Sequence, residues 1–159
     1  MPEHDNLFFL WPRLCHDITR RARNQGPKTF NDVMAVNVSA NFQLIRCMEP
    51  LLRQSDAGRA VFVTSGAAHK ANAYLGPYAA SKAGVARLTE ALAEELKVRD
   101  ATMNALLPSI IDTPVNRADM PDADYSKWVT PQSLADVIVF LLSDRARDVT
   151  GALIPVTGR

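Results

Sequence analysis

The sequence predicts an α/β fold in which helices cover both faces of a doubly wound parallel sheet, giving three layers. Helical and strand patterns alternate along the chain after residue 29. The strand candidates are short continuous apolar runs, which are typical of strands buried on both faces. The segments between them are long enough for helical crossovers, and parallel strands need such crossovers.

The first predicted helix runs from Thr29 to about Arg53. Thr29-Phe30-Asn31-Asp32 resembles a capping box with Asp in place of Glu. Apolar residues then recur at helical spacing, at Phe30, Val33, Met34, Val38, Phe42, Ile45, Met48 and Leu52. Pro50 and Gly58 favour an end to this helix before the predicted strand at Arg59–Thr64.

The second half of the chain repeats the alternation. Residues 66–76 form a predicted loop, and Pro77 opens an alanine-rich helix from Tyr78 to about Val98. A buried strand follows at Thr102–Leu107, and residues 108–126 are expected to be irregular. Thr130-Pro131 opens a third helix, and a last strand covers 151–156. The expected apolar side of the third helix comprises Leu134, Val137, Ile138, Phe140 and Leu141.

Residues 1–28 form an atypical N-terminal segment that does not share this rhythm. Leu7–Trp11 has the composition of a strand, and Leu14–Arg23 that of a short amphipathic helix. The edge of the predicted sheet beside Arg59–Thr64 would be apolar and open to aggregation. We therefore expect either that Leu7–Trp11 adds there as a strand or that two chains pair across this edge.

Composition excludes several classes of function. The 159 residues carry a formal net charge of +1, so we expect no nucleic-acid partner. No apolar run is long enough for a membrane span, and no signal peptide is recognised. Cys15 and Cys47 form no metal-like spacing with the histidines, so we expect no metal and a reduced, cytoplasmic protein.

Tyr78 and Lys82 are the first candidates for chemistry, because they lie one helical turn apart on the same face. An ammonium group near a phenol favours the phenolate, which would let Tyr78 exchange a proton near neutral pH. The pair alone is a weak signal, since a surface tyrosine and a solvated lysine give the same pattern.

Ser65 and Asn37 add to this signal. Ser65 follows the first buried strand, and ligands of parallel α/β sheets bind at the carboxyl ends of strands. Its hydroxyl could stabilise a developing oxyanion, or simply form a local turn. Asn37 falls on the apolar face of its helix, where an amide needs hydrogen-bond partners. It is either a core asparagine bonded to backbone or a functional residue.

Together these motifs resemble the short-chain dehydrogenase/reductase family. The resemblance rests on Asn37 in MAVNVSANF, on Ser65 in VFVTSGAA, and on Tyr78 and Lys82 in YAASKAGV. Pro108-Ser109-Ile110-Ile111-Asp112-Thr113 is similar to a family segment that meets the nicotinamide, although Ser109 replaces the usual glycine. Such a turn would be strained here if it needed a positive φ. The resemblance covers residues 29–159 and implies a partial Rossmann-like domain.

The resemblance also implies roles. Tyr78 would be the acid/base, Lys82 would assist it and hold the nicotinamide ribose, Ser65 would orient the substrate oxygen, and Asn37 would anchor a water. Tyr78, Lys82, Pro108, Ile111 and Thr113 would contact NAD or NADP. The substrate would be a small alcohol or carbonyl compound. A homo-oligomer is expected, because the family packs the helices matching 29–53 and 78–98 into a four-helix dimer bundle.

One part of the family pattern is absent from this sequence. No glycine-rich phosphate-binding turn occurs, since Gly26 is the first glycine and Gly58 the second. The N-terminal strands that carry this turn in the family are therefore expected to be missing, and cofactor binding to be weak. Two functions stay open: an oxidoreductase that transfers hydride, and a truncated, inactive remnant that persists as an oligomerising α/β fragment.

Overall fold

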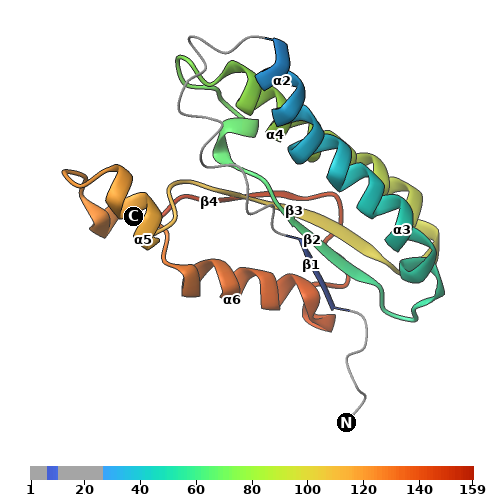
Figure 1. The fold of residues 1–159 in the computed structure, drawn as a ribbon. Helices are drawn as coiled ribbons and strands as arrows, with labels where there is room; N and C mark the ends of the chain where they lie inside the picture. Colours follow the sequence, from blue (N-terminus) through green and yellow to red (C-terminus); the bar gives the residue numbers. More distant parts are fainter. Residues whose placement is uncertain (1–6, 11–26) are drawn as a thin grey trace.

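The computed structural model describes residues 7–10 and 27–159 of the protein. Its centre is a four-stranded sheet in the order β1-β2-β3-β4, with every neighbouring pair parallel (Figure 1). The strands are β1 (Leu7–Leu10), β2 (Arg59–Val63), β3 (Thr102–Pro108) and β4 (Leu153–Val156). Sequence order and spatial order coincide, so each connection moves the chain one strand further across the sheet.

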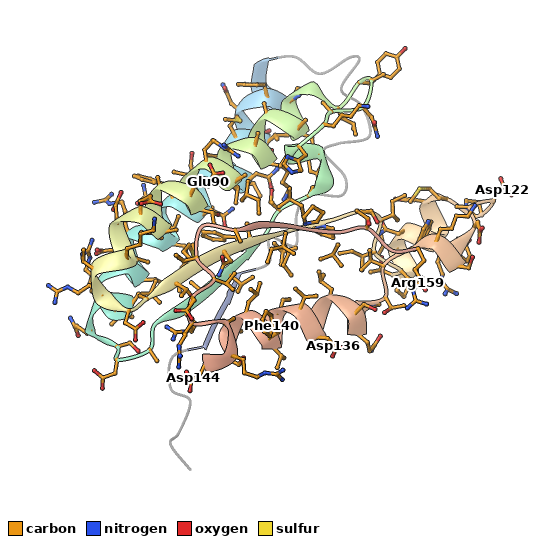
Figure 2. The ribbon with its side chains drawn as sticks, turned by 180° about the vertical axis from the view of Figure 1, so that it is seen from behind. Glu90, Asp122, Asp136, Phe140, Asp144 and Arg159 are labelled. Carbon is orange, nitrogen blue, oxygen red and sulfur yellow. The ribbon has the colours of Figure 1, made fainter. Side chains whose placement is uncertain are left out.

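Helices cover both faces of the sheet, which confirms the predicted three-layer α/β/α architecture. One face carries α2 (Pro27–Met34), α3 (Ala40–Gln54) and α4 (Gly76–Leu96). The opposite face carries α6 (Pro131–Leu142), whose N-cap hydroxyl, Thr130 Oγ1, accepts the Ser133 amide. Figure 2 shows this arrangement from behind, with Glu90 of α4 and Phe140 of α6 on opposite sides of the sheet.

The two inner strands divide the core into two clusters, because successive side chains of a strand point to opposite faces. Ala60 and Phe62 of β2 join the cluster under α3 and α4, while Val61 and Val63 join the cluster under α6. Every residue of β2 and of β3 is buried. The continuous apolar runs therefore identified these strands correctly.

The N-terminal edge of the sheet is occupied by β1. Leu7–Leu10 pairs in parallel with Arg59–Phe62, which confirms the first of the two expectations for this edge. Trp11, the predicted helix at Leu14–Arg23 and both Cys15 and His16 lie outside the described residues.

The first long helix differs from the predicted one in its start and its middle. It begins at Pro27, and a π-helical turn, η2 (Ala35–Ser39), separates α2 from α3. The turn is closed by the Ala40 amide, which donates to the Ala35 oxygen. A π turn adds one residue to the helical turn and rotates the next part of the helix, so apolar spacing of 3.6 residues cannot hold on both sides of it.

That rotation accompanies errors in the expected apolar faces. Phe30 and Phe42 are each 44% exposed, although both fit the helical pattern.

On α6, Phe140 is 43% exposed while Leu134, Ile138 and Leu141 are buried. Phe140 lies next to the buried Leu141 in sequence, so it falls at the rim of the apolar stripe rather than within it.

Two further differences concern short elements. The segment expected to be irregular contains α5 (Pro114–Asp119) and the 3₁₀ turn η5 (Tyr125–Lys127). The last strand begins at Leu153 rather than at Gly151, because Gly151 has a φ of +70°. Within the described part of the chain, no helix is long and apolar enough to cross a membrane.

Candidate active site

The first turns of α4 carry the tyrosine and lysine. Pro77 lies in the first turn of this helix, where a missing N–H has no cost. Lys82 Nζ lies 5.5 Å from the centroid of the Tyr78 ring, within the range of cation–π attraction. Lys82 is only 4% exposed, whereas Tyr78 is half-buried. A buried ammonium group is therefore held beside an accessible phenol.

Ser65 follows the carboxyl end of β2 and caps a local turn. Its backbone is extended, and its Oγ accepts the Ala67 amide at 3.2 Å at the start of the 3₁₀ turn η3 (Gly66–Ala68). This turn packs against α4. The cap uses the oxygen only as an acceptor, so the hydroxyl proton is still available to a ligand. The local-turn interpretation of Ser65 and the functional one are thus compatible.

Thr64 connects the end of β2 to the lysine. Its hydroxyl donates to the Lys82 carbonyl oxygen at 2.9 Å, and its side chain is buried. Thr64 therefore contacts the turn of α4 that carries Lys82, and Ser65 is the next residue along the chain. This bond places Ser65, Tyr78 and Lys82 at the same end of the sheet.

Asn37 lies in the π-helical turn and faces α4. Its side chain is 2% exposed, and its Nδ2 donates to Ser81 Oγ at 2.9 Å. Its backbone oxygen accepts a hydrogen bond from Asn41 Nδ2. Single π turns inside α-helices are frequent at functional sites. The buried amide is satisfied by hydrogen bonds, as its position on the apolar face requires.

Pro108, Ile111 and Thr113 form the other side of this end of the sheet. Pro108 is the last residue of β3, and a Cβ added to Gly66 would lie 3.6 Å from its oxygen. Ile111 forms an isolated parallel bridge with Val129. Thr113 caps α5, its hydroxyl oxygen accepting the Asn116 amide at 3.2 Å. The segment therefore starts at the carboxyl end of β3 and is fixed by defined backbone contacts.

Ser109 does not strain this segment. Among the described non-glycine residues, only Tyr74 and Asp100 have a positive φ. Ser109 instead donates from its amide to Val156 O at 2.9 Å and from its hydroxyl to Thr157 O at 2.8 Å. The concern raised by the missing glycine does not apply to this chain.

An ion pair stabilises the segment that follows β3. Arg117 donates to both carboxylate oxygens of Asp112, from Nε at 2.6 Å and from Nη2 at 2.7 Å. These hydrogen bonds hold the pKa of the Asp112 carboxyl below its ordinary value, and the same contact raises the pKa of Arg117. The guanidinium also lies 4.8 Å from the centroid of the Tyr125 ring. The last turn of α5 is thereby tied to the residue before its N-cap and to the turn that follows the helix.

Three residues that connect the site were not found from the sequence: Thr64, Ser81 and Asn41. Thr64 and Asn41 each donate to a backbone oxygen, of Lys82 and Asn37, and Ser81 accepts from the Asn37 amide nitrogen. The only sequence signal was that each polar side chain stands in an otherwise apolar stretch, and that signal does not identify a partner. Among the residues that the structure describes, no cluster of three potential metal ligands occurs.

These contacts define a parallel α/β protein with a tyrosine–lysine pair at the carboxyl end of its sheet. Comparison with known proteins extends this. A family model described as "Enoyl-(Acyl carrier protein) reductase" matches residues 14–158. The oxidoreductase YciK of Escherichia coli (strain K12) is 35% identical over 127 residues, covering 80% of this chain and 50% of that protein. The 3-oxoacyl-[acyl-carrier-protein] reductase FabG of Pseudomonas aeruginosa is 33% identical, with 80% and 55% covered.

Solved structures agree with these relatives. A short-chain dehydrogenase of Escherichia coli CFT073 complexed with NADPH superposes with a TM-score of 0.74 at 34% identity, covering 83% of this chain and 55% of that one. A 3-oxoacyl-[acyl-carrier protein] reductase of Brucella melitensis with bound NAD gives 0.72 at 29% identity, covering 84% and 52%. The chain belongs to the short-chain dehydrogenase/reductase family. It spans about half the length of the curated relatives it matches.

Proposed function

We propose that this chain carries the catalytic half of an NAD(P)-dependent oxidoreductase that transfers hydride between the nicotinamide and an alcohol or carbonyl compound. In this proposal Tyr78 exchanges a proton with the substrate oxygen and Lys82 supports it. Ser65 orients that oxygen, and Asn37 anchors a water molecule in the proton relay. The proposal treats residues 29–159 as the partial dehydrogenase domain and residues 1–28 as a separate, atypical segment.

One observation carries the proposal: a buried lysine ammonium lies 5.5 Å from the ring of a half-buried tyrosine at the carboxyl end of a parallel sheet. A buried ammonium is costly unless it is paired or hydrogen-bonded, and its charge favours a nearby phenolate. A tyrosine in that setting is suited to general acid–base chemistry. The alternative of a surface tyrosine beside a solvated lysine is excluded, because Lys82 is only 4% exposed.

The residues present fit one end of the cofactor. Tyr78 and Lys82 offer a hydroxyl and an ammonium group for the ribose. Pro108, Ile111 and Thr113 line the carboxyl end of β3, where ligands of such sheets bind. Thr113 uses its hydroxyl oxygen as an acceptor, so its proton is available to a carboxamide. When bound, the nicotinamide supplies or accepts the hydride. The sequence has no glycine-rich turn for the pyrophosphate.

Turnover of carbonyl compounds with NADPH or NADH tests the proposal. Tyr78→Phe should abolish turnover, because the ring remains but the exchangeable proton is lost. Tyr125→Phe is the matched control, because it also removes a phenol hydroxyl. Tyr125 lies in η5, away from α4, and its hydroxyl donates to Pro121 O at 3.0 Å. Turnover that survives in Tyr78→Phe and falls in Tyr125→Phe would overturn the assignment.

A second candidate is an inactive remnant that does not bind cofactor and persists as an oligomer. The absence of a glycine-rich turn from the sequence favours it. Calorimetric titration with the cofactor separates the two candidates, since the remnant gives no heat of binding even at millimolar cofactor.

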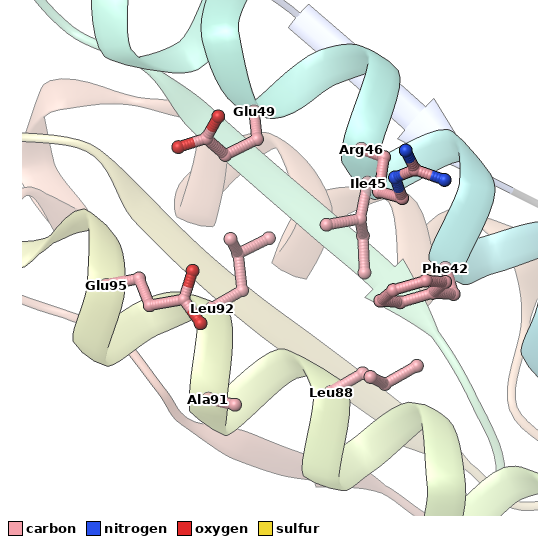
Figure 3. Close-up of a pocket in the computed structure, with 8 residues that line it drawn as sticks. All are labelled: Phe42, Ile45, Arg46, Glu49, Leu88, Ala91, Leu92 and Glu95. Carbon is pink, nitrogen blue, oxygen red and sulfur yellow. The ribbon is translucent and has the colours of Figure 1, made fainter.

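Either candidate includes a homo-oligomer formed through α3 and α4. A groove between these helices is lined by Phe42, Ile45, Arg46, Glu49, Leu88, Ala91, Leu92 and Glu95 (Figure 3). Its apolar floor is flanked by charges of both signs. A two-fold axis brings the same patch of two copies together, so Arg46 of one copy can face a glutamate of the other. Ala91 allows the helices to approach closely.

Sedimentation equilibrium tests this interface. Leu88→Glu places a charge on the groove floor and should convert an oligomer to monomer. Val139→Glu is the control, because Val139 is 65% exposed on α6, on the opposite side of the sheet. An oligomer that persists in Leu88→Glu and dissociates in Val139→Glu would place the interface on α6 instead.

A further inference from the structure

We propose that Ser81 is a positioning residue that couples the Asn37 amide to the backbone of Tyr78. The inference rests on the proposed function, because it concerns how Tyr78 is held for proton exchange. Ser81 touches neither substrate nor cofactor in this proposal, and it acts through the two residues to which it is bonded.

Two hydrogen bonds meet at the Ser81 hydroxyl. It donates to the Tyr78 carbonyl oxygen at 2.7 Å and lies 2.9 Å from Asn37 Nδ2. A carbonyl can only accept, so the single hydroxyl proton is committed to Tyr78. Ser81 Oγ must then accept from Asn37, which fixes the amide with its nitrogen toward α4. The direction of both bonds is thus set by valence alone.

Burial makes this relay specific. Ser81 is 0% exposed and Asn37 is 2% exposed, so water cannot take the place of either partner without opening the contact between η2 and α4. Removing one partner of a buried hydrogen bond leaves the other desolvated and unpaired, which is unfavourable. The Asn37 orientation and the Tyr78 turn are therefore linked energetically, even though they belong to different helices.

The same turn of α4 is held at a second carbonyl. Thr64 donates to Lys82 O at 2.9 Å, so Tyr78 and Lys82 each receive a buried hydroxyl at the backbone oxygen. The Thr64 bond ties this turn to the sheet, and the Ser81 bond ties it to the π-helical turn. Ser81 bonds both Asn37 and Tyr78, so a change in the position of Asn37 reaches the tyrosine–lysine pair through Ser81.

A matched control exists on the same helix. Thr89 is also 0% exposed, and its hydroxyl donates to Val85 O at 2.9 Å, one turn back along α4. Both residues bond a carbonyl of their own helix, but only Ser81 also accepts from Asn37. Ser81→Ala and Thr89→Val therefore each remove a buried helical hydroxyl, and only the first breaks the relay.

Titration of the tyrosinate absorbance gives a readout that needs no turnover. The chain has three tyrosines, and subtracting the Tyr78→Phe curve isolates Tyr78. A free tyrosine titrates near pH 10. We expect Tyr78 to titrate at lower pH than this in the unmodified protein. Ser81→Ala should raise the Tyr78 midpoint toward the free value by about half a unit or more, because the phenol is no longer held against the ammonium. Thr89→Val should leave it unchanged.

The outcomes separate the two proposals. An unmodified protein whose Tyr78 titrates as a free phenol overturns the proposed function, and the positioning role with it. A lowered midpoint that is the same in Ser81→Ala overturns only the positioning role. Asn37→Ala should give a similar shift, and adding Ser81→Ala to it should add little, since both act on one relay. Additive shifts would show two independent effects. If Ser81→Ala does not fold, Ser81→Cys keeps a weaker donor and acceptor and should give a smaller shift.

Discussion

Gly58 illustrates how tightly single residues are placed in this fold. It lies where the chain leaves α3 and enters β2, and an added Cβ would be 2.7 Å from the Leu52 backbone oxygen and 3.1 Å from Ala101 Cβ. Backbone oxygens at that distance cannot move aside without disturbing the last turn of α3. The glycine is therefore required by close approach.

We expect Gly58→Ala to lower the free energy of unfolding by about 1–3 kcal/mol, the usual cost of overpacking. Gly76→Ala is the control, because no atom lies within 4 Å of its added Cβ and it begins α4. Alanine there should stabilise by up to about 1 kcal/mol, because it lowers the conformational entropy of the unfolded chain and meets no clash. Urea unfolding measures both. Equal effects of the two changes would contradict the role of close approach at Gly58.

At the same scale, the sequence predicted the burial of Asn37 but not its contact. Asn37 was placed correctly on a buried face, because Val33, one turn before it, is buried on the same side. The partner of its amide, Ser81, lies 44 positions away in sequence, and no local pattern reports such a contact. The assignment of catalytic roles to Asn37, Ser65, Tyr78 and Lys82 is still a prediction.

Among the elements, α5 has an electrostatic feature that can be measured. Hydrogen bonds from Arg117 lower the pKa of Asp112 at the N-terminal end of this helix. A lowered carboxyl pKa means that the pairing stabilises the folded state above the ordinary carboxyl pKa. That contribution is lost as the pH falls through the lowered value in the folded state.

Arg117→Gln should raise the Asp112 pKa toward its ordinary value and make the acid end of the stability profile shallower. Carbon-detected NMR titration of the carboxyl groups measures this directly. Asp124 is an internal control, because its lowered pKa comes first from the Ser126 hydroxyl and then from Lys127. If Asp124 moved as much as Asp112, the shift would be a general field effect rather than the loss of one pair.

Helices and strands were predictable from sequence where the burial pattern is uniform along the element or a capping motif marks its start. The inner strands are buried on both faces and appear as unbroken apolar runs, while Thr130-Pro131 marks the start of α6. The π-helical turn was not predictable, since no local sequence pattern marks it, and the helix that it contacts, α4, lies far along the chain. A Cβ on Gly84 would lie 3.3 Å from Val38 Cγ2, which shows how close that contact is. The helix α5 spans only six residues, too few to show periodicity.

At the scale of the whole molecule, the proposed site lies at one end of the sheet, and the inner strands are paired on both sides. β1 covers β2 at one edge, and β4 covers β3 at the other. The residues proposed for the nicotinamide end lie on α4 and from the end of β3 to the N-cap of α5, where Thr113 stands. The sequence offers no glycine-rich turn for the rest of the cofactor. The two halves of the cofactor should therefore contribute very differently to binding by these 159 residues.

We expect this chain to bind NADH no more than about tenfold tighter than reduced nicotinamide mononucleotide, which lacks the adenosine half. Each tenfold in affinity corresponds to about 1.4 kcal/mol, so the adenosine half should add no more than that. Isothermal titration calorimetry with both ligands measures the difference. Lys82→Met keeps a long buried side chain but removes the ammonium, and it should abolish the heat from both ligands. Micromolar NADH binding with weak mononucleotide binding would show that the chain does hold the adenosine half. No heat from either ligand at millimolar concentration would favour the inactive remnant, because the nicotinamide end would then have no affinity of its own.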